Sequence, residues 1–284
     1  MTVRIVTDST SDLPPEICRE LDITVVPLTV SFGDTGYRDG VDLTADEFYR
    51  KLATSDKLPT TSQPSAGAFA EAYKEVAKET DQILSIHISG KLSQTQNSAR
   101  LAASEMDGGC NVQVMDSLQV SLGLGCIVIS AARAARDGAS MADLEQLVAK
   151  MMPETRTLAL LETLEYLAKG GRIGKVQAYL GNSLRPLSIF KVIPIVEVRD
   201  GEAHPLARVR SRGKGLDRLL LEVGGASGIA MAGVAYSTNR EEAESVLDSL
   251  RPLVSPDNLV LSRFGPVLGT HLGPGALGLG FATG

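Results

Sequence analysis

Two kinds of apolar pattern alternate along the first half of the chain. Between segments of helical periodicity, namely PPEICREL (14–21), ADEFYRKLAT (45–54), AGAFAEAYKEVAKE (66–79) and TQNSARLAASEM (95–106), lie short apolar runs. These runs are rich in β-branched residues and predict strands: VRIVTDS (3–9), ITVVPLTVSF (23–32), QILSIHIS (82–89) and NVQVMDS (111–117). Strand–helix alternation favours a parallel sheet covered by helices, so we assign residues 1–150 to such a domain.

Beyond about residue 150 the predicted strands follow one another more closely. The segment LSIFKVIPIVEVRDGEAHPLARVR (187–210) indicates strands joined by a hairpin turn at Arg199-Asp200-Gly201-Glu202, and GIAMAGVAYS (228–237) and NLVLSRFG (258–265) predict two more. We expect residues 151–284 to form an α+β domain with a mixed sheet. The predicted fold class is therefore α/β, with two domains and a ligand between them.

Composition sets the broad class of the protein. The 284 residues include 28 Lys and Arg against 34 Asp and Glu, a net charge of −6 without a dense basic stripe, which argues against nucleic-acid binding. Cys18, Cys110 and Cys126 are scattered, which argues against disulfides or a zinc site and indicates a reducing compartment. We find neither a signal peptide nor an apolar run long enough to cross a bilayer. We expect a soluble cytoplasmic protein without a metal.

Hydroxyl groups gather where predicted strands and helices meet. PTTSQPS (59–65) precedes one helix, and SGKLSQTQNSA (89–99) leads from a strand into another. Ligands of parallel sheets bind beyond the carboxyl ends of the strands, and a helix entrance offers free N–H groups and a positive dipole to an anion. Ordinary N-capping by Ser62 or Ser65 is the competing interpretation of the first segment, and spacing alone favours the two equally.

Two further segments carry candidate polar residues. Asp8 and Ser9 follow the first strand and are candidates for shaping a site, whereas we expect Asp12 to cap the helix that carries Pro14 in its first turn. In KGGRIG (169–174), glycines surround Arg172, which makes it a candidate contact for a phosphate or a partner protein.

Sequence signatures of hydrolytic enzymes are missing. Histidine occurs only at positions 87, 204 and 271, which excludes H-E-x-x-H, and no serine stands in G-x-S-x-G. We expect His87 to be a buried, hydrogen-bonded residue of its strand and His204 to be exposed in the hairpin. His271 lies in GTHLGPGALGLG (269–280), whose glycines spell the dinucleotide fingerprint G-x-G-x-x-G. That fingerprint needs a following helix and an acidic residue about twenty positions on, and neither is found here.

Five motifs, in order along the chain, resemble those of the DegV family of bacterial fatty-acid-binding proteins. They are TDSTSDLP (7–14), TSQPS (61–65), S-x-x-L-S-x-T (89–95), LEYLAKGGRIG (164–174) and GTHLGPGALG (269–278). The resemblance implies a two-domain α/β fold with one long-chain fatty acid buried between the domains. It also implies a non-catalytic role as the acyl-carrying subunit of a fatty acid kinase, whose separate kinase subunit phosphorylates the carboxylate. No cofactor is implied besides the bound acid.

The same resemblance assigns residues to the carboxylate. By motif, the ligand would meet Thr61, Ser62, Ser93 and His271, and a second group of candidates comprises Ser9, Gly90, Thr95 and Arg172. The family pattern S-S-x-L-S-G-T-Y differs here, because Gly90, Gln94 and Gln96 replace its second Ser, its Gly and its Tyr. We expect these departures to affect head-group geometry or chain preference.

The residues by themselves agree with this interpretation. Hydroxyls, helix N–H groups and one imidazole suit a single carboxylate better than a polyphosphate, which would favour Lys, Arg and a metal. Each buried methylene contributes about 0.8 kcal/mol, so the tail would set affinity and the polar cluster orientation. Two alternatives stay open: a stand-alone kinase or transferase for a small metabolite, with Asp8, Asp116 and Arg172 at its centre, and a regulatory lipid sensor. Transient membrane contact for ligand exchange is a further expectation.

Overall fold

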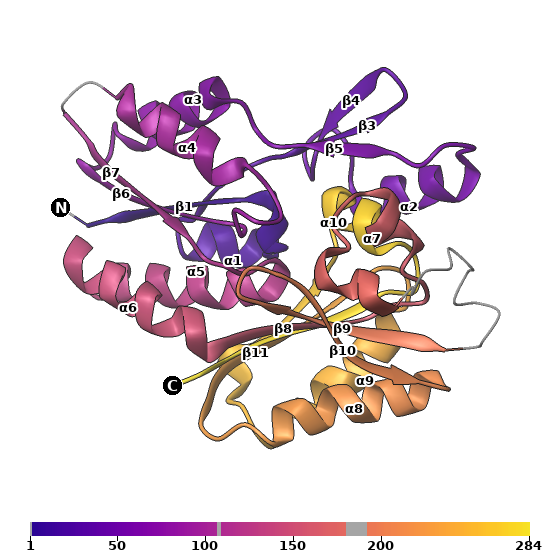
Figure 1. The fold of residues 1–284 in the computed structure, drawn as a ribbon. Helices are drawn as coiled ribbons and strands as arrows, with labels where there is room; N and C mark the ends of the chain where they lie inside the picture. Colours follow the sequence, from indigo (N-terminus) through magenta and orange to yellow (C-terminus); the bar gives the residue numbers. More distant parts are fainter. Residues whose placement is uncertain (1, 107–108, 180–191) are drawn as a thin grey trace.

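The computed structural model describes residues 2–106, 109–179 and 192–284. Two large sheets lie in different halves of the chain, with helices between and outside them (Figure 1). The elements up to the end of the first sheet are β1 (Arg4–Asp8), η1 (Ser9–Ser11), α1 (Pro15–Glu20), β2 (Thr24–Val26), β3 (Thr29–Phe32), β4 (Thr35–Arg38), α2 (Ala45–Thr54), β5 (Thr60–Ser62), α3 (Ala66–Val76), β6 (Gln82–His87), α4 (Thr95–Ser104) and β7 (Asn111–Asp116).

The first sheet is parallel, as predicted, with strand order β2-β1-β6-β7. The run predicted as one strand over 23–32 divides at Pro27, which has no N–H to donate to a neighbouring strand. After this break β3 leaves the parallel sheet and pairs antiparallel with β4 and β5. Residues Thr60–Ser62 are therefore strand β5, and the helix entrance lies later, where Ser65 caps α3.

The second half of the chain is built around a mixed sheet. Its elements are α5 (Ser121–Arg136), α6 (Met141–Glu154), β8 (Thr155–Leu160), α7 (Glu165–Lys169), η2 (Gly174–Tyr179), β9 (Ile193–Arg199), β10 (Glu202–Val209), α8 (Arg212–Gly224), β11 (Ile229–Tyr236), α9 (Arg240–Leu250), η4 (Pro256–Asn258), β12 (Leu259–Arg263), α10 (Pro266–Leu272) and β13 (Leu277–Thr283). The strand order is β10-β9-β8-β13-β11-β12.

In this sheet β11 and β12 pair in parallel and the other neighbours pair antiparallel. The predicted hairpin joins β9 to β10, with positive φ at Asp200 (51°) and Gly201 (81°), as a tight two-residue turn requires. The part of the predicted strand region that covers residues 187–191 lies outside the described residues.

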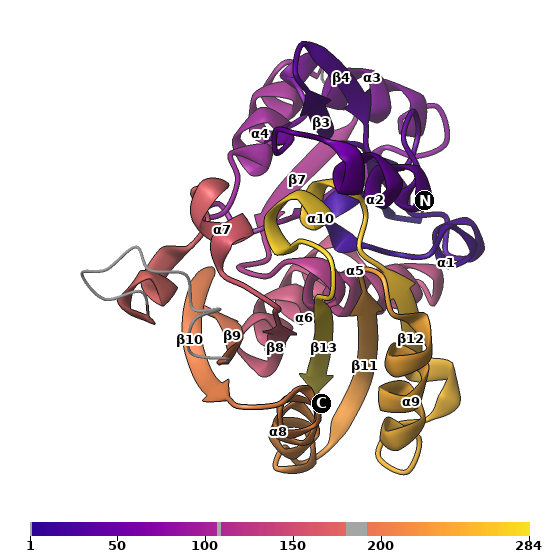
Figure 2. The ribbon, with the colours of Figure 1, turned by 90° about the vertical axis from the view of Figure 1, so that its right-hand side faces the viewer.

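Helix α5 lies between the two sheets (Figures 1 and 2). Most of its side chains are buried, and glycines let the backbone of a strand come very close to it. A Cβ added to Gly280 of β13 would lie 2.4 Å from the backbone nitrogen of Gly123 at the start of α5. Helices α3 and α4 cover the outer face of the parallel sheet, and α8 and α9 cover the outer face of the mixed sheet (Figure 1).

Strand β13 shows how the sequence lets α5 approach the mixed sheet closely. Its large residues, Leu277, Leu279 and Phe281, pack in the core under α8 and α9. The intervening Gly278 and Gly280 have no side chains to place on the opposite face, the one toward α5. Neighbouring β8 continues this pattern with Ala159. The glycines of β13 therefore let Phe264 and the start of α5 pack against the inner face of the mixed sheet, beside the cavity that Ala159 lines.

Two local predictions are wrong. Asp12 does not cap α1, whose N-cap is Pro14 without a side-chain hydrogen bond. Instead Asp12 is buried with a left-handed φ of 50°, because distant segments supply its hydrogen-bond donors. His271 does not lie in a glycine loop but in the last turn of α10, and Gly273, with φ of 75°, ends that helix. Within the described ranges, every helix is too short or too polar to span a membrane.

Candidate functional site

A cavity lies between the two halves of the chain and borders both sheets. It holds about 940 Å³ of space that protein atoms do not fill, part of it open to solvent. Apolar side chains form most of its wall, including Leu28, Ile88 and Leu92 from the first half and Ala159, Val196 and Phe264 from the second. Polar groups gather where β5, the loop before α4 and α10 approach each other. The cavity is thus a mainly apolar enclosure with a polar region, a form suited to an amphipathic ligand.

Four residues predicted to bind a carboxylate all line this cavity: Thr61, Ser62, Ser93 and His271. Thr61 and His271 are in direct contact, with 2.8 Å between Oγ1 and Nε2. Strand β5 supplies Thr61 and Ser62, so a strand next to α10 presents these hydroxyls rather than the helix entrance that the sequence suggested. The Ser93 hydroxyl is 2.8 Å from Thr95 Oγ1, just before α4.

The imidazole of His271 is almost fully enclosed. Burial, with a smaller contribution from Arg172, lowers its pKa to about 4, so the ring is neutral near pH 7. Its Nδ1 is buried without a hydrogen-bond partner among the described residues. Gly170 lies against that atom, since a Cβ added to Gly170 would be 2.2 Å from Nδ1. Gly170 therefore makes room for the ring, a role beyond ending the helix.

Arg172 connects the two sides of the polar region. Its Nε donates to the carbonyl of Leu92, next to Ser93, over 3.2 Å, and an Nη donates to the carbonyl of Gly170 over 2.7 Å. The guanidinium lines the cavity and is half-buried. It is the only member of the second group of candidates that does so among the described residues.

The other three candidates of that group lie behind the cavity wall. Ser9 accepts a hydrogen bond from the N–H of Leu28, and Thr95 is fully buried beside Ser93. The N–H of Gly90 donates to Asp116 Oδ2 over 3.1 Å. These contacts give the three residues a supporting place in the loops that carry the cavity residues.

The departures from the family pattern at positions 90 and 96 are linked in the structure. A Cβ added to Gly90 would lie 2.0 Å from Gln96 Nε2, so the glutamine amide fills the space that a side chain at position 90 would need. That same Nε2 donates to Asp116 Oδ2 over 3.0 Å. Gln94 is exposed and is not among the described residues that line the cavity. Gly90 and Gln96 thus both donate to Asp116 and together support the loop behind Ser93.

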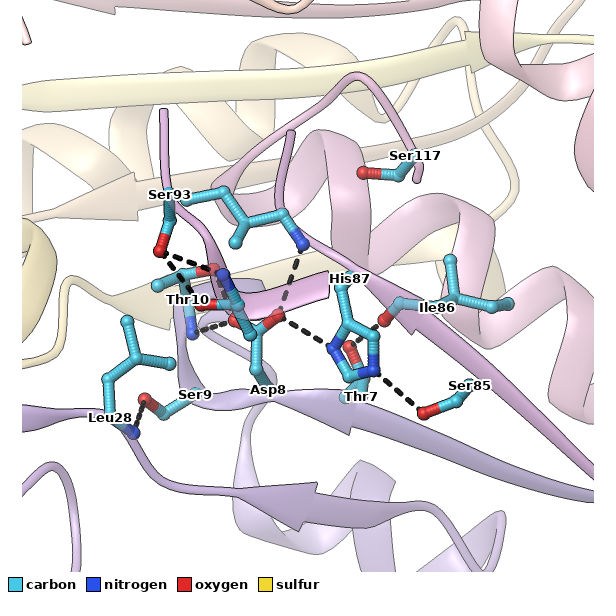
Figure 3. Close-up of polar contacts among 12 residues, drawn as sticks. Thr7, Asp8, Ser9, Thr10, Leu28, Ser85, Ile86, His87, Ser93 and Ser117 are labelled. Carbon is cyan, nitrogen blue, oxygen red and sulfur yellow. Dashed lines mark hydrogen bonds and ion pairs between the residues drawn. The ribbon is translucent and has the colours of Figure 1, made fainter. Parts of the chain in front are cut away.

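A buried network joins β1 to β6 below the Ser93 loop (Figure 3). His87 Nδ1 donates to Asp8 Oδ2 over 3.0 Å, and Ser85 donates to His87 Nε2 over 2.7 Å. The Tyr73 hydroxyl donates in turn to Ser85. This confirms that His87 is a buried, hydrogen-bonded residue. The serine–histidine–aspartate order resembles a catalytic triad, but all three side chains are fully buried, so Ser85 cannot meet a substrate in this arrangement.

Sequence reasoning missed Thr10, Ser121 and Thr157, whose side chains also line the cavity. Thr10 donates to Asp8 Oδ1, and Thr157 donates to Gln119 Oε1 over 2.8 Å. Ser121 is 2.7 Å from Asp12 Oδ2. Each hydroxyl already has a partner behind the wall, so the wall offers few unmet polar groups to an alkyl chain. Only the position of Thr10 after the first strand was a usable signal.

Among the described residues, no group of three or more His, Cys, Asp or Glu side chains is placed to hold a metal ion. The donors around the polar region are hydroxyls, one imidazole and one guanidinium. Groups of these kinds are able to donate hydrogen bonds to an anion.

The comparisons with known proteins identify the family. The model of the DegV family, described as "Uncharacterised protein, DegV family", matches residues 2–284. A DegV domain-containing protein of Deinococcus radiodurans is 38% identical over 286 residues, which cover 98% of each chain. Protein DegV of Bacillus subtilis is 34% identical over 283 residues, again with 98% of each chain covered.

Solved structures agree in fold along the whole chain. A structure that describes fatty acid binding of a DegV family protein from Thermus thermophilus superposes with a TM-score of 0.90 at 33% identity. The crystal structure of DegV from Bacillus subtilis, described as a fatty acid binding protein, gives a TM-score of 0.89 at 33% identity. Both comparisons cover 100% of each chain.

Proposed function

The chain belongs to the DegV family, and we propose that it binds one long-chain fatty acid in the cavity between its two sheets. The carboxylate meets Thr61, Ser62, Ser93 and His271, and the acyl chain runs along the inner face of the mixed sheet. The observation that carries the proposal is the division of the cavity into a largely apolar wall and a region of hydroxyls and imidazole. The fatty acid binding described for the two superposed DegV structures supports it.

The shape and chemistry of the wall explain why an acyl chain is the expected ligand. Burying each methylene contributes about 0.8 kcal/mol, and Leu92, Ala159 and Val196 provide apolar wall against which it can be buried. A hydrogen bond to a charged acceptor adds about 1.5–3 kcal/mol. The chain therefore supplies most of the affinity, and the polar residues set which end of the ligand lies at Thr61.

We further propose that the bound acid is presented to a separate kinase subunit, which phosphorylates the carboxylate, so that this protein is a carrier and not the catalyst. Arg172 is suited to the mouth of such a site because it lines the cavity and is only half-buried. The scattered cysteines suit a cytoplasmic place for this exchange.

Organic extraction of the purified protein, followed by mass spectrometry of the extract, tests the binding function. A stoichiometric long-chain fatty acid is the expected result. An empty extract, together with failure of the protein to bind added palmitic acid, would refute the proposal. ATP turnover by the protein alone would favour the stand-alone kinase instead.

A second assay separates the carrier from a regulatory lipid sensor. The loaded protein is mixed with ATP and a bacterial fatty acid kinase subunit, and acyl phosphate is measured. The carrier yields acyl phosphate in amounts that follow the bound acid. A sensor binds the acid but gives no product with any such subunit.

A further inference from the structure

Helix α10, which carries His271, is held to the first half of the chain at both of its ends. At its last turn His271 contacts Thr61. Just before its first turn, the N–H of Gly265 donates to Asp12 Oδ1 over 2.9 Å. The Asp39 carboxyl lies at the same place, since a Cβ added to Gly265 would be 2.9 Å from Asp39 Oδ1. Neither aspartate is among the described residues that line the cavity, so each can affect the cavity only through its neighbours.

Asp12 joins three segments that are distant in sequence. Besides Gly265, its carboxyl contacts Ser121 at the start of α5, with 2.7 Å between Oδ2 and Oγ. Its main-chain carbonyl accepts a hydrogen bond from Ser262 at the end of β12. The left-handed φ of 50° is a conformation that aspartate tolerates better than most residues, and it directs these groups toward the second half of the chain.

Asp39 is 5% exposed, and its Oδ2 is buried without a hydrogen-bond partner among the described residues. Burial raises the pKa of its carboxyl to about 7, against the opposing effect of the Ser9 hydroxyl and the Val267 N–H. The nearby Asp8 raises the pKa further.

Other titratable groups surround the two aspartates. The negative charge of Asp39 raises the pKa of Asp12, and both aspartates raise the pKa of the buried Tyr49 hydroxyl. Arg263 lies over the Tyr49 ring, 5.2 Å from its centre, and is the cation of this cluster among the described residues. A negative charge on Asp39 is therefore placed among acidic neighbours.

We propose that Asp12 and Asp39 are positioning residues for the head-group site, because by fixing the start of α10 they set the place of the His271 imidazole against Thr61. The helix has seven residues, so a displacement at Gly265 is carried along its short, rigid axis to His271. The inference rests on the proposed fatty acid site, which supplies the ligand that the imidazole meets.

The pH dependence of fatty acid affinity tests this inference, because a purely structural role of Asp39 would not make affinity depend on its charge. The pKa of Asp39 is about 7 in the folded protein, above its ordinary value of 3.8. The contribution of the protonated carboxyl to the free energy of unfolding is therefore complete below pH 3.8 and is lost as pH rises to about 7. His271, with its pKa lowered to about 4, stays neutral in the upper part of this range. Ionisation of Asp39 places a negative charge beside Gly265 at the start of α10, and on the inference above this moves His271, so fatty acid affinity of the wild type should fall several-fold as pH rises from about 6 to about 8.

The experiment measures the affinity of the full-length protein for palmitic acid across this pH range. Asp39→Asn keeps the shape of the side chain but cannot ionise, so its affinity should change much less with pH. Asp42→Asn is the matched control, because Asp42 is exposed and pairs with Arg38, away from α10. Ionisation of palmitic acid itself is common to all three proteins and cancels in the comparison.

A second measurement needs no ligand. The chain has three histidines, so the ring resonances of His271 can be followed by NMR against those of His87 and His204. Asp39→Asn and Asp12→Asn should shift the His271 resonances and leave those of His204 unchanged. Gly265→Ala should also shift the His271 resonances and leave those of His204 unchanged. The φ of −65° at Gly265 accepts alanine, and the added Cβ would press on Asp39.

An unchanged pH dependence in Asp39→Asn, with unmoved His271 resonances in that variant and in Gly265→Ala, overturns the inference. If Asp39→Asn does not fold, the resonances of Gly265→Ala decide. If the wild type binds no palmitic acid, the proposed function fails, and the ligand-free resonances still test whether the aspartates position His271.

Discussion

Thr61 and His271 are 210 positions apart in the chain, and their side chains meet at 2.8 Å in the polar region of the cavity. One comes from a strand of the small three-stranded sheet and the other from the last turn of α10. The contact thus forms only when the two halves of the chain are docked. A ligand that binds both residues also stabilises that docking.

Replacing His271 with Ala should weaken fatty acid binding without changing how the tail is recognised. A hydrogen bond to a charged group contributes about 1.5–3 kcal/mol, so a loss of roughly tenfold or more in affinity is expected. Affinities for dodecanoic, tetradecanoic and hexadecanoic acids separate the two effects. The increment per methylene should match the wild type while all three affinities fall together. A changed increment with an unchanged overall level would show that His271 acts on the tail instead.

Gly170 should tolerate no side chain, although its backbone conformation is ordinary for any residue. The Cβ of Gly170→Ala would lie 2.2 Å from His271 Nδ1 and displace the imidazole from Thr61. We expect a loss of fatty acid affinity close to that of His271→Ala. Gly213→Ala is the matched control, because Gly213 is in α8 with nothing near its added Cβ. That control should bind normally and gain up to about 1 kcal/mol in stability, measured by urea unfolding.

Arg172→Ala should raise the pKa of His271. Burial is the main cause of the low value of about 4, and Arg172 is the second cause, so the pKa should move only part of the way toward 6.5. Since the folded pKa lies below the ordinary one, the neutral ring loses stability as pH falls from about 6.5 toward 4, and the variant should show a smaller loss. NMR titration of the ring gives the pKa directly. Arg172→Lys, which keeps the charge, should stay near the wild-type value, and an equal shift in both variants would contradict this electrostatic explanation.

The same Arg172→Ala protein should still bind palmitic acid while acyl phosphate formation with a kinase subunit decreases. Loss of fatty acid binding would instead give Arg172 a structural role through its contacts with Leu92 and Gly170.

Ala159→Phe should reduce the space available to the acyl chain. Ala159 lines the cavity from β8. Long acids should lose affinity more than short ones, and the preferred chain should become shorter. Competition between dodecanoic and octadecanoic acids, measured by mass spectrometry of the bound fraction, checks this. An unaltered ratio would mean that the tail does not pass Ala159.

Local patterns in the sequence were sufficient to predict most of the helices and strands. The β-branched apolar runs of β1, β6 and β7 and the Asp200-Gly201 turn are patterns of neighbouring residues, and the structure has these elements as predicted. The motifs also pointed to Thr61, Ser93 and His271, and all three line the cavity. Their use as carboxylate ligands remains a prediction, as does the domain boundary near residue 150.

Only the tertiary structure decided how these segments support one another. Residues Thr60–Ser62 form strand β5 instead of a helix entrance because they pair with β3, about thirty residues earlier. Asp12 accepts hydrogen bonds from Ser121 and Gly265 and does not cap its own helix. Gly170 is needed for a histidine a hundred residues later. Sequence periodicity reports which face of a segment is apolar, whereas these contacts depend on how two sheets dock around α5. That docking is set by packing between distant segments, and no local pattern encodes it.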